Sequence, residues 1–278
     1  MMQQESNNVR EDEKNAGCGF ETSDNGIEKL TANDFSRIKN VIAVMSGKGG
    51  VGKSSVTSLL ACEFKKKGYA VGVLDADITG PSLPKMFGVK GRAEHNGIAL
   101  LPLSSANGIK VMSLNLLTPN EDDPVIWRGP LIAGTVKQFW SDVAWGALDY
   151  LFVDLPPGTG DVPLTVMQSL PLNGVVIVSS PQDLAVMIVS KAIKMAQMMD
   201  IPILGLVENM SGVVCPHCGE KFELFGPGQG REISEKFQIP FIGSLPLDPH
   251  LSKLCDQGKV IEYDSNLFID YIPERLTQ

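Results

Sequence analysis

The chain has 278 residues, of which 43% are hydrophobic and 20% are charged. This composition is typical of a globular protein and excludes the disordered, collagen-like and disulfide-rich classes. The formal net charge of −8 disfavours nucleic acid as the main partner, because binding a phosphate backbone requires a surplus of basic residues.

Residues 1–37 are predicted to form an acidic, disordered tail. Residues 1–34 contain three basic and eight acidic side chains, a net charge of −5, and they show no apolar periodicity. The segment lacks the basic and apolar regions of a signal peptide, and no run in the chain approaches the ~18 apolar residues of a membrane span. We therefore expect a cytoplasmic protein that binds no membrane.

Residues 38–278 are predicted to form one α/β domain, a doubly wound, mostly parallel sheet flanked by helices. Its strands are compact apolar runs without polar alternation, which is typical of strands buried on both faces. The predicted strands are Val41–Met45, Ala70–Leu74, Tyr150–Val153, Gly174–Val178, Ile203–Val207 and Phe241–Leu245. The predicted helices are Lys53–Lys67, Pro130–Val143, Leu184–Met199 and Gly230–Phe237. This alternation indicates βαβ units.

One predicted feature interrupts this alternation. Ile98–Leu103 and Lys110–Leu114 are short segments separated by Ser104–Gly108, an arrangement typical of a β-hairpin. We expect this hairpin to be inserted in the α/β pattern.

A glycine-rich segment follows the first predicted strand and precedes the first predicted helix. It reads Ser-Gly-Lys-Gly-Gly-Val-Gly-Lys-Ser at residues 46–54 and matches a P-loop in both spelling and context. In such a loop the backbone N–H groups and the helix N-terminus bind phosphate, Lys53 contacts the β- and γ-phosphates, and Ser54 is a ligand of Mg²⁺. The sequence therefore predicts binding of ATP and Mg²⁺ by Gly47, Lys48, Gly49, Gly50, Val51, Gly52, Lys53 and Ser54.

Lys48 is an additional lysine near the start of this loop. It resembles the second lysine of the deviant P-loop ATPases, which crosses a dimer interface to the nucleotide of the partner subunit. In that role Lys48 would act as an arginine finger does, supplying positive charge to the phosphates when two subunits close together. The alternative is a solvated loop cation.

Two acidic motifs follow predicted strands, at the edge where a parallel sheet binds its ligands. The first begins at Asp75, which we assign to the nucleotide site, and includes Asp77, which we expect to orient the attacking water. The second begins at Asp154, which resembles a Walker B aspartate that holds Mg²⁺, and includes Gly158, whose N–H can donate to the γ-phosphate. An isolated aspartate after a strand is more often a helix cap, but beside a P-loop the nucleotide role is favoured.

Two of the five cysteines form a Cys-x-x-Cys pair in a predicted loop at about residues 211–225. Cys215 and Cys218, followed by Gly219, form half of a tetrahedral metal site. Cys62 and Cys255 do not have this spacing. The simplest completion is a second subunit that supplies the same pair across a twofold axis. Four thiolates suit both zinc and an iron–sulfur cluster.

The chain resembles the Mrp/ApbC family of P-loop ATPases, cytosolic iron–sulfur cluster carriers related to MinD, ParA and the nitrogenase iron protein. The motifs that carry the resemblance are Gly47–Ser54, Asp75–Ser82, Trp127–Pro130, Asp154–Asp161, Ser180–Asp183, Glu208–Ser211, Cys215–Glu220 and Leu245–Asp248. The resemblance implies a P-loop NTPase fold, slow ATP hydrolysis, and a homodimer in which Cys215 and Cys218 bind a bridging 4Fe–4S cluster. It also implies that the protein delivers the cluster to apo iron–sulfur proteins. Its partners would be these apoproteins and cluster assembly factors. Further nucleotide contacts are implied for Ser55, Asn209 and Pro246, with Asn209 at the adenine.

Two alternative functions share this nucleotide site. A MinD- or ParA-like positioning ATPase needs a basic amphipathic C-terminal helix or a basic surface, whereas residues 264–278 contain three acidic residues and one arginine. The second alternative is the same dimeric ATPase with a structural zinc at the four cysteines. A thioredoxin-like role is less favoured, because a redox pair lies at a helix N-terminus and this pair lies in a glycine-bounded loop.

Overall fold

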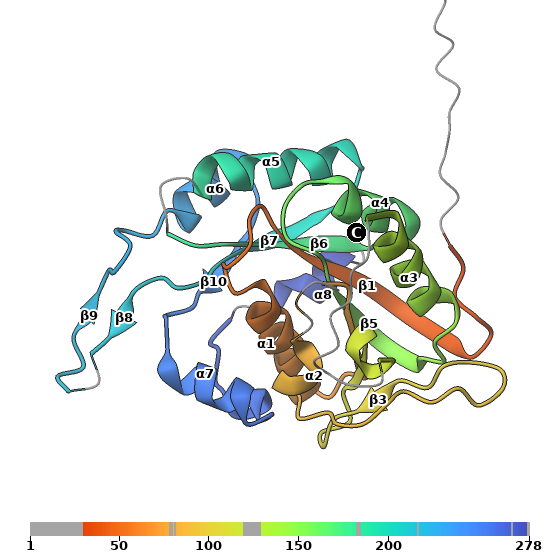
Figure 1. Cartoon of the computed structure of the whole chain (residues 1–278). Helices are drawn as coiled ribbons and strands as arrows, with labels where there is room; N and C mark the ends of the chain where they lie inside the picture. Colours follow the sequence, from red (N-terminus) through yellow and green to blue (C-terminus); the bar gives the residue numbers. More distant parts are fainter. Residues whose placement is uncertain are drawn as a thin grey trace, which may run out of the picture.

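Eight strands of the described chain form one sheet with helices on both faces (Figure 1). The structure is a computed structural model that describes residues 30–77, 80, 82–118, 129–181, 185–215, 217–267 and 269–276. The strands are β1 (Ser36–Ser46), β2 (Val71–Asp75), β3 (Leu103–Ser104), β4 (Lys110–Ser113), β5 (Gly146–Asp154), β6 (Gly174–Ser179), β7 (Ile203–Glu208) and β10 (Phe241–Ser244). Their order is β10-β7-β6-β1-β5-β2-β4-β3, and every neighbouring pair is parallel except β3 and β4.

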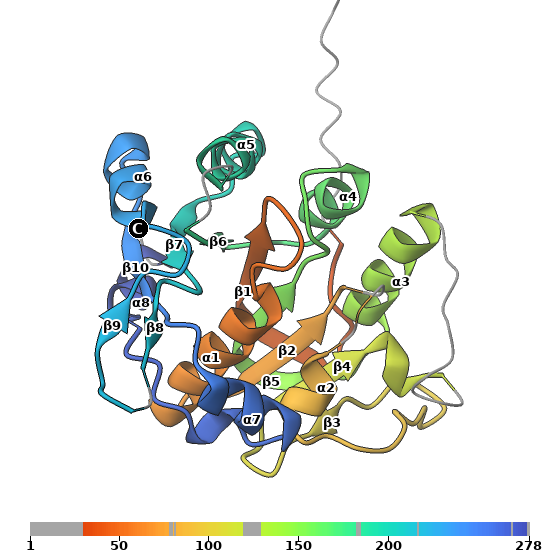
Figure 2. The same cartoon turned by 60° about the vertical axis from the view of Figure 1, so that its left-hand side comes forward.

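The helices cover the two faces of the sheet in two groups, which Figure 2 separates. One face carries α1 (Lys53–Lys66), α2 (Leu83–Met86), α7 (Pro249–Asp256), the 3-10 helix η2 (Val260–Glu262) and α8 (Tyr271–Leu276). The other face carries α3 (Gly129–Ser141), α4 (Asp161–Ser169), α5 (Ala185–Met198) and α6 (Gly230–Phe237). The doubly wound, mostly parallel sheet predicted from the sequence is confirmed.

The central strand β1 explains why the predicted strands are continuous apolar runs. Ile42 and Val44 belong to the core under α1, whereas Val41, Ala43 and Met45 belong to the core under the other helices. Successive side chains of a strand point to opposite faces, so a strand covered on both sides must be apolar at every position.

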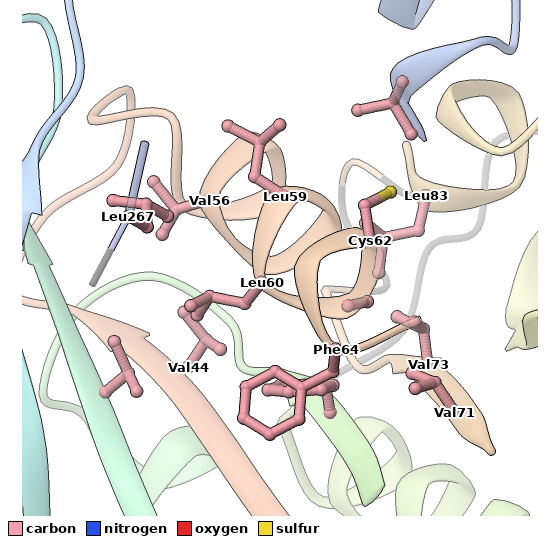
Figure 3. Packing of buried hydrophobic residues seen from close by; sticks show 14 of the residues in the cluster. Val44, Val56, Leu59, Leu60, Cys62, Phe64, Val71, Val73, Leu83 and Leu267 are labelled. Atoms are coloured by element: carbon pink, nitrogen blue, oxygen red, sulfur yellow. The ribbon is translucent and has the colours of Figure 1, made fainter. Parts of the chain in front are cut away.

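Helix α1 is fixed to the sheet by apolar residues at helical spacing. Val56, Leu60 and Phe64 recur every four residues and are fully buried, and Figure 3 shows them beside the strands of the sheet. The ring of Phe64 packs edge-on against Tyr150 and Phe152 of β5, with centroid distances of 4.4 and 5.3 Å. The helix that follows the glycine-rich loop is therefore held rigidly on the sheet.

The expected hairpin is present but belongs to the main sheet. Leu103 and Val111 are antiparallel partners, as predicted, but the first strand contains only two residues. The second strand, β4, also pairs in parallel with β2 and so extends the sheet at its edge. The hairpin is therefore a continuation of the sheet and not an addition to it.

Four helices of the described chain, α2, α4, α7 and α8, were not predicted. Each has a proline among its first three residues: Pro84, Pro163, Pro249 and Pro273. Proline breaks a helix interior but is tolerated in the first turn, where its missing N–H has no intrahelical acceptor. The prolines that interrupt the periodic pattern therefore mark helix starts.

The described part of the chain begins before residue 38, the predicted start of the domain. β1 begins at Ser36, the Leu30 N–H donates to the Ser169 carbonyl at 3.0 Å, and the Leu30 carbonyl accepts from the Trp140 indole at 3.0 Å. Residues 1–29 of the predicted tail lie outside the described residues. Each helix in the described part of the chain is too short or too polar to traverse a lipid bilayer.

The ends of α2 and α7 meet at two glycines, which gives a prediction for stability. Gly258 has a φ of 71°, and a Cβ on it would lie 2.3 Å from the Cα of Gly88. We expect Gly258→Ala to lower the free energy of unfolding by about 2–4 kcal/mol, because the left-handed backbone and the overlap with Gly88 both become unfavourable. Urea denaturation monitored by circular dichroism measures this loss.

Gly68 provides the matched control for this substitution. Its φ is 91°, and a Cβ on it would meet no atom within 4 Å. Gly68→Ala should therefore lower the free energy of unfolding by only about 1–2 kcal/mol, the cost of placing alanine in a left-handed backbone conformation. Equal losses of unfolding free energy in the two variants would contradict the prediction, because they would show that the overlap with Gly88 adds no cost.

Candidate functional site

The glycine-rich loop joins β1 to α1, and its glycines are required by backbone conformation and by close packing. Gly50 and Gly52 have φ values of 80° and 75°, where glycine is strongly favoured. A Cβ on Gly47 would lie 2.1 Å from Ile188 Cγ2, and one on Gly52 would lie 2.2 Å from Asn209 Nδ2. The loop therefore adopts a path that other residues cannot follow.

Lys53 lies at the start of α1 beneath this loop, with its ammonium group among carboxylates. Its side chain is 5% exposed, and its Nζ lies 2.8 Å from Asp154 Oδ1 and 3.8 Å from Asp77 Oδ2. The Nζ makes no aligned hydrogen bond with any described residue. Its charge is balanced inside the protein while its protons remain available to a phosphate oxygen.

The carboxylate of Asp154, at the end of β5, accepts from two hydroxyl groups of α1. Ser54 Oγ donates to Oδ2 at 2.5 Å and Thr57 Oγ1 donates to Oδ1 at 2.7 Å. Hydroxyl and carboxylate oxygens are the hard ligands that Mg²⁺ prefers. Thr57 had no predicted role, although it lies three residues after Ser54 on the same face of the helix.

Asp75, at the end of β2, is the register partner of Asp154 and is buried. Its oxygens accept from the N–H groups of Asp77 at 3.2 Å, Ser82 at 3.0 Å and Leu83 at 3.2 Å. Burial raises its pKa to about 8, and the nearby Asp154 acts in the same direction. Asp75 therefore shapes the turn that carries Asp77.

The loop after β5 packs against the glycine-rich loop. The Gly158 N–H donates to the Ser46 carbonyl at 2.9 Å, and a Cβ on Gly49 would lie 3.8 Å from that of Pro157. Gly158 was expected to donate to a γ-phosphate, but in this conformation its N–H is used to join the two loops. Donation to a phosphate requires that this bond open.

Lys48 lies in the outer part of the glycine-rich loop. Its side chain is partly exposed, and its carbonyl accepts from the Ser46 hydroxyl at 2.9 Å. The loop conformation around it is therefore fixed by a side chain of β1. Partial exposure is compatible with the expected contact across a dimer interface.

A cavity of about 250 Å³ lies beside the loop, and four predicted nucleotide residues line it: Gly52, Ser55, Asn209 and Pro246. Asn209 follows β7, is 5% exposed and donates its Nδ2 to the Val51 carbonyl at 2.9 Å. Segments far apart in the sequence thus meet at one hollow next to the phosphate loop. Its position suits the base and ribose of a nucleotide.

No role was predicted from the sequence for Asp248, which also lines this cavity. Its carboxylate accepts from the His250 N–H at 2.8 Å and from the Tyr263 hydroxyl at 3.0 Å, and it caps α7. The available signal was the Leu-Pro-Leu-Asp motif at residues 245–248, of which only Pro246 was assigned. Asp248 therefore fixes the wall of the cavity that α7 forms.

The cysteine pair lies on a separate two-stranded hairpin, β8 (Val213–Val214) and β9 (Lys221–Phe222), which Figure 1 shows projecting from the body of the molecule. At its tip the Cys215 N–H donates to the Glu220 carbonyl and the Gly219 N–H donates to the Cys215 carbonyl, both at 2.9 Å. Gly219 has a φ of 74°. The turn places both cysteines at the end of a short, hydrogen-bonded stem.

The local backbone favours the thiolate form of Cys215. The N–H of Cys218, and after it that of His217, lowers the pKa of the Cys215 thiol. Cys218 is exposed. Thiolates are the form in which cysteines bind metals, so the backbone at the hairpin tip favours Cys215 as a ligand.

The other described cysteines are unsuited to this chemistry. Cys62 and Cys255 are buried, and burial raises the pKa of Cys62 to about 12 and that of Cys255 in the same direction. Among the described residues, no group of three or more His, Cys, Asp or Glu side chains is placed to hold a metal ion. The hairpin therefore offers two ligands where a tetrahedral site needs four.

The predicted nucleotide residues lie at or just beyond the carboxyl ends of β1, β2, β5, β7 and β10, and the cysteine hairpin follows β7; Figure 2 shows these strands. Ligands of open α/β sheets bind at this edge, where the strand order reverses. Parts of the predicted motifs lie outside the described residues: Ile78, Thr79, Pro81, Trp127, Arg128, Gln182, Asp183 and Pro216. The fifth cysteine, Cys18, also lies outside them.

The model of the NUBPL iron-transfer P-loop NTPases, a ParA family, matches residues 37–272 of the chain. The chain is 47% identical over 258 residues to an iron-sulfur cluster carrier protein of Clostridium perfringens, an alignment that covers 90% of this chain and 89% of that protein. It is also similar to a nucleotide-binding protein of Archaeoglobus fulgidus, solved in complex with ADP. The TM-score is 0.75 at 49% identity, and the match covers 85% of this chain and 93% of that one.

A more distant structural neighbour is the MinD cell division protein of Aquifex aeolicus. The TM-score is 0.57 at 20% identity, and the match covers 86% of this chain and 98% of that one. At this level of identity the likeness concerns the fold alone.

Proposed function

The chain belongs to the family of NUBPL iron-transfer P-loop NTPases, and from this premise we propose that it is an ATP-hydrolysing carrier or scaffold of iron–sulfur clusters. In this proposal two chains bind one 4Fe–4S cluster, and the cluster is delivered to apoproteins. The observation that supports it is the cysteine hairpin, which presents two exposed or partly exposed thiols and follows the same strand, β7, as Asn209 of the nucleotide cavity.

In this proposal the nucleotide site hydrolyses ATP slowly and under the control of a second chain. The loop N–H groups and Lys53 would bind the phosphates, and Ser54 and Asp154 would hold Mg²⁺, which would neutralise phosphate charge. Asp77, 3.8 Å from Lys53 Nζ, orients the attacking water. Lys48 from a second chain completes the site, so a single chain turns over slowly.

The cluster site is completed by symmetry. A twofold axis brings Cys215 and Cys218 of two chains together, and four thiolates hold the cluster as cargo. Exposure of Cys218 at the hairpin tip keeps the cluster accessible to a receiving protein. The partners in this proposal are apo iron–sulfur proteins and cluster assembly factors, and the location is the cytoplasm, without nucleic acid or membrane as partners.

One observation also supports a structural zinc at the same cysteines, since a glycine-containing turn with N–H groups directed at sulfur suits zinc as well. A positioning ATPase of the MinD type is less supported. The last described helix, α8, has six residues and carries Glu274 and Arg275, which gives it no basic face for an anionic membrane.

We expect anaerobically purified and reconstituted protein to contain about four iron and four sulfide per two chains, with the absorption of a 4Fe–4S cluster. The cluster-loaded protein should elute as a dimer, because the shared ligands link metal binding to association. Iron, sulfide and zinc analysis with anaerobic size-exclusion chromatography measures this. Zinc without sulfide would support the structural alternative, and one full cluster per monomer would contradict the bridging arrangement.

A further inference from the structure

Glu208 is a buried carboxylate that the proposed mechanism does not use. It ends β7 and is 3% exposed. Its Oε1 accepts from the N–H groups of Gln229 at 2.8 Å and Gly230 at 2.7 Å, and its Oε2 accepts from the Ser211 hydroxyl at 2.9 Å. Three donors thus converge on one side chain, and their hydrogen bonds offset the cost of burying a carboxylate.

The Glu208 carboxylate caps the N-terminus of α6, although Glu208 itself lies outside the helix. Gln229, the N-cap of α6, makes no side-chain cap hydrogen bond of its own. Glu208 supplies the missing acceptor, and its negative charge lies at the positive end of the helix. A Cβ on Gly228 would lie 2.2 Å from Glu208 Oε2, so the chain passes the carboxylate as closely as glycine allows.

Glu208 therefore holds both ends of the segment that carries the cysteines. Ser211 lies where the chain leaves β7, and Gln229 lies where it returns to α6. Between them lies the hairpin with Cys215 and Cys218. The exit is also joined to the wall of the nucleotide cavity, since the Leu247 N–H donates to the Gly212 carbonyl at 2.9 Å.

The next residue contacts the phosphate loop. Asn209 Nδ2 donates to the Val51 carbonyl at 2.9 Å, and the Asn209 N–H donates to the Ser179 carbonyl at 2.8 Å. Val51 belongs to the glycine-rich loop, whose backbone N–H groups are predicted to bind the phosphates. Two consecutive residues at the end of β7 thus hold the phosphate loop and the base of the cysteine hairpin.

We propose that Glu208 is a positioning residue that couples nucleotide binding to the geometry of the cysteine hairpin. When phosphate binds, a shift of the Val51 carbonyl moves the Asn209 side chain that donates to it. Glu208, the preceding residue, passes this movement to Ser211 and Gln229, at the two ends of the hairpin segment. A role of this coupling in cluster transfer rests on the proposed function. The coupling itself can be measured with nucleotide alone, without a cluster. By reciprocity, a metal on the hairpin changes nucleotide affinity by the same factor.

Hydrogen–deuterium exchange of the metal-free protein with and without MgADP tests this proposal. We expect MgADP to slow exchange of the amides of residues 213–222 about five-fold or more, a typical size for coupling between two sites. In Glu208→Ala this response should fall below about two-fold while the Kd for MgADP stays within about three-fold of the wild-type value. Glu208→Gln keeps a carbonyl acceptor and should restore at least half of the response.

Glu232→Gln is the matched control, because it removes an exposed carboxylate from the first turn of the same helix. It should respond as the wild type does. Ser211→Ala removes one donor to Glu208 and should halve the response, which keeps the test available if Glu208→Ala does not fold. A hairpin that is insensitive to MgADP in the wild type, a full response in Glu208→Ala, or an equal loss in Glu232→Gln would overturn the proposal. Because no cluster is present, these outcomes are independent of whether the chain carries one.

Discussion

Cys215→Ser and Cys218→Ser should each abolish cluster binding and the metal-dependent dimer. In the proposed dimer each chain supplies two ligands from one hairpin, so one substitution removes two of the four thiolates around the shared site. We expect iron and sulfide content to fall at least about ten-fold, since the remaining thiolates cannot enclose the cluster. Metal analysis after anaerobic reconstitution, with size-exclusion chromatography of the same samples, measures both effects.

Cys62→Ala and Cys255→Ala are the controls for this prediction. Both thiols are buried with raised pKa values, and neither lies on the hairpin. These variants, together with Cys18→Ala, should retain the cluster and the dimer. Full cluster retention in Cys218→Ser, or its loss in Cys255→Ala, would place the ligands elsewhere.

The parts of the molecule that sequence reasoning predicted are those in which fold and chemistry are encoded in one contiguous segment. Residues 41–54 contain the buried strand, the loop and the start of the helix, and each imposes a distinct local requirement. Alternate residues of β1 enter two cores, Gly50 and Gly52 need a left-handed backbone, and Lys53 begins a helix. Such requirements are visible without knowledge of tertiary contacts.

The features that sequence reasoning missed depend on contacts between distant segments. The hydrogen bond between Thr57 and Asp154 joins residues 97 positions apart in the sequence, and the one between Asn209 and Val51 joins residues 158 positions apart. Glu208 follows the predicted strand Ile203–Val207 and was assigned no role, and only the return of the chain at Gln229 brings it to the start of a helix. A single sequence specifies such pairs through the fold as a whole, so local periodicity and spacing do not reveal them.

Lys53→Ala and Lys48→Ala should separate nucleotide binding from hydrolysis. Loss of the buried Lys53 ammonium, 2.8 Å from Asp154, should weaken ATP affinity about 100-fold or more, because its charged hydrogen bonds to phosphate disappear. It also leaves Asp154 without a countercharge, so thermal unfolding should be measured alongside. Lys48→Ala should bind ATP with nearly normal affinity but hydrolyse it about 1000-fold more slowly, as removal of an arginine finger does.

A mixture of these two variants distinguishes a trans role of Lys48 from a role within its own chain. If Lys48 acts across the interface, a mixed dimer contains one complete site, with the nucleotide bound by the chain that keeps Lys53 and the finger supplied by the chain that keeps Lys48. Random mixing makes about half of the dimers mixed, each with one active site of two, so about a quarter of the wild-type ATPase rate should return. If Lys48 acts within its own chain, each mixed dimer still lacks a complete site and the mixture stays inactive. Steady-state phosphate release from equimolar mixtures therefore decides the question, and wild-type turnover by Lys48→Ala alone would remove Lys48 from the mechanism.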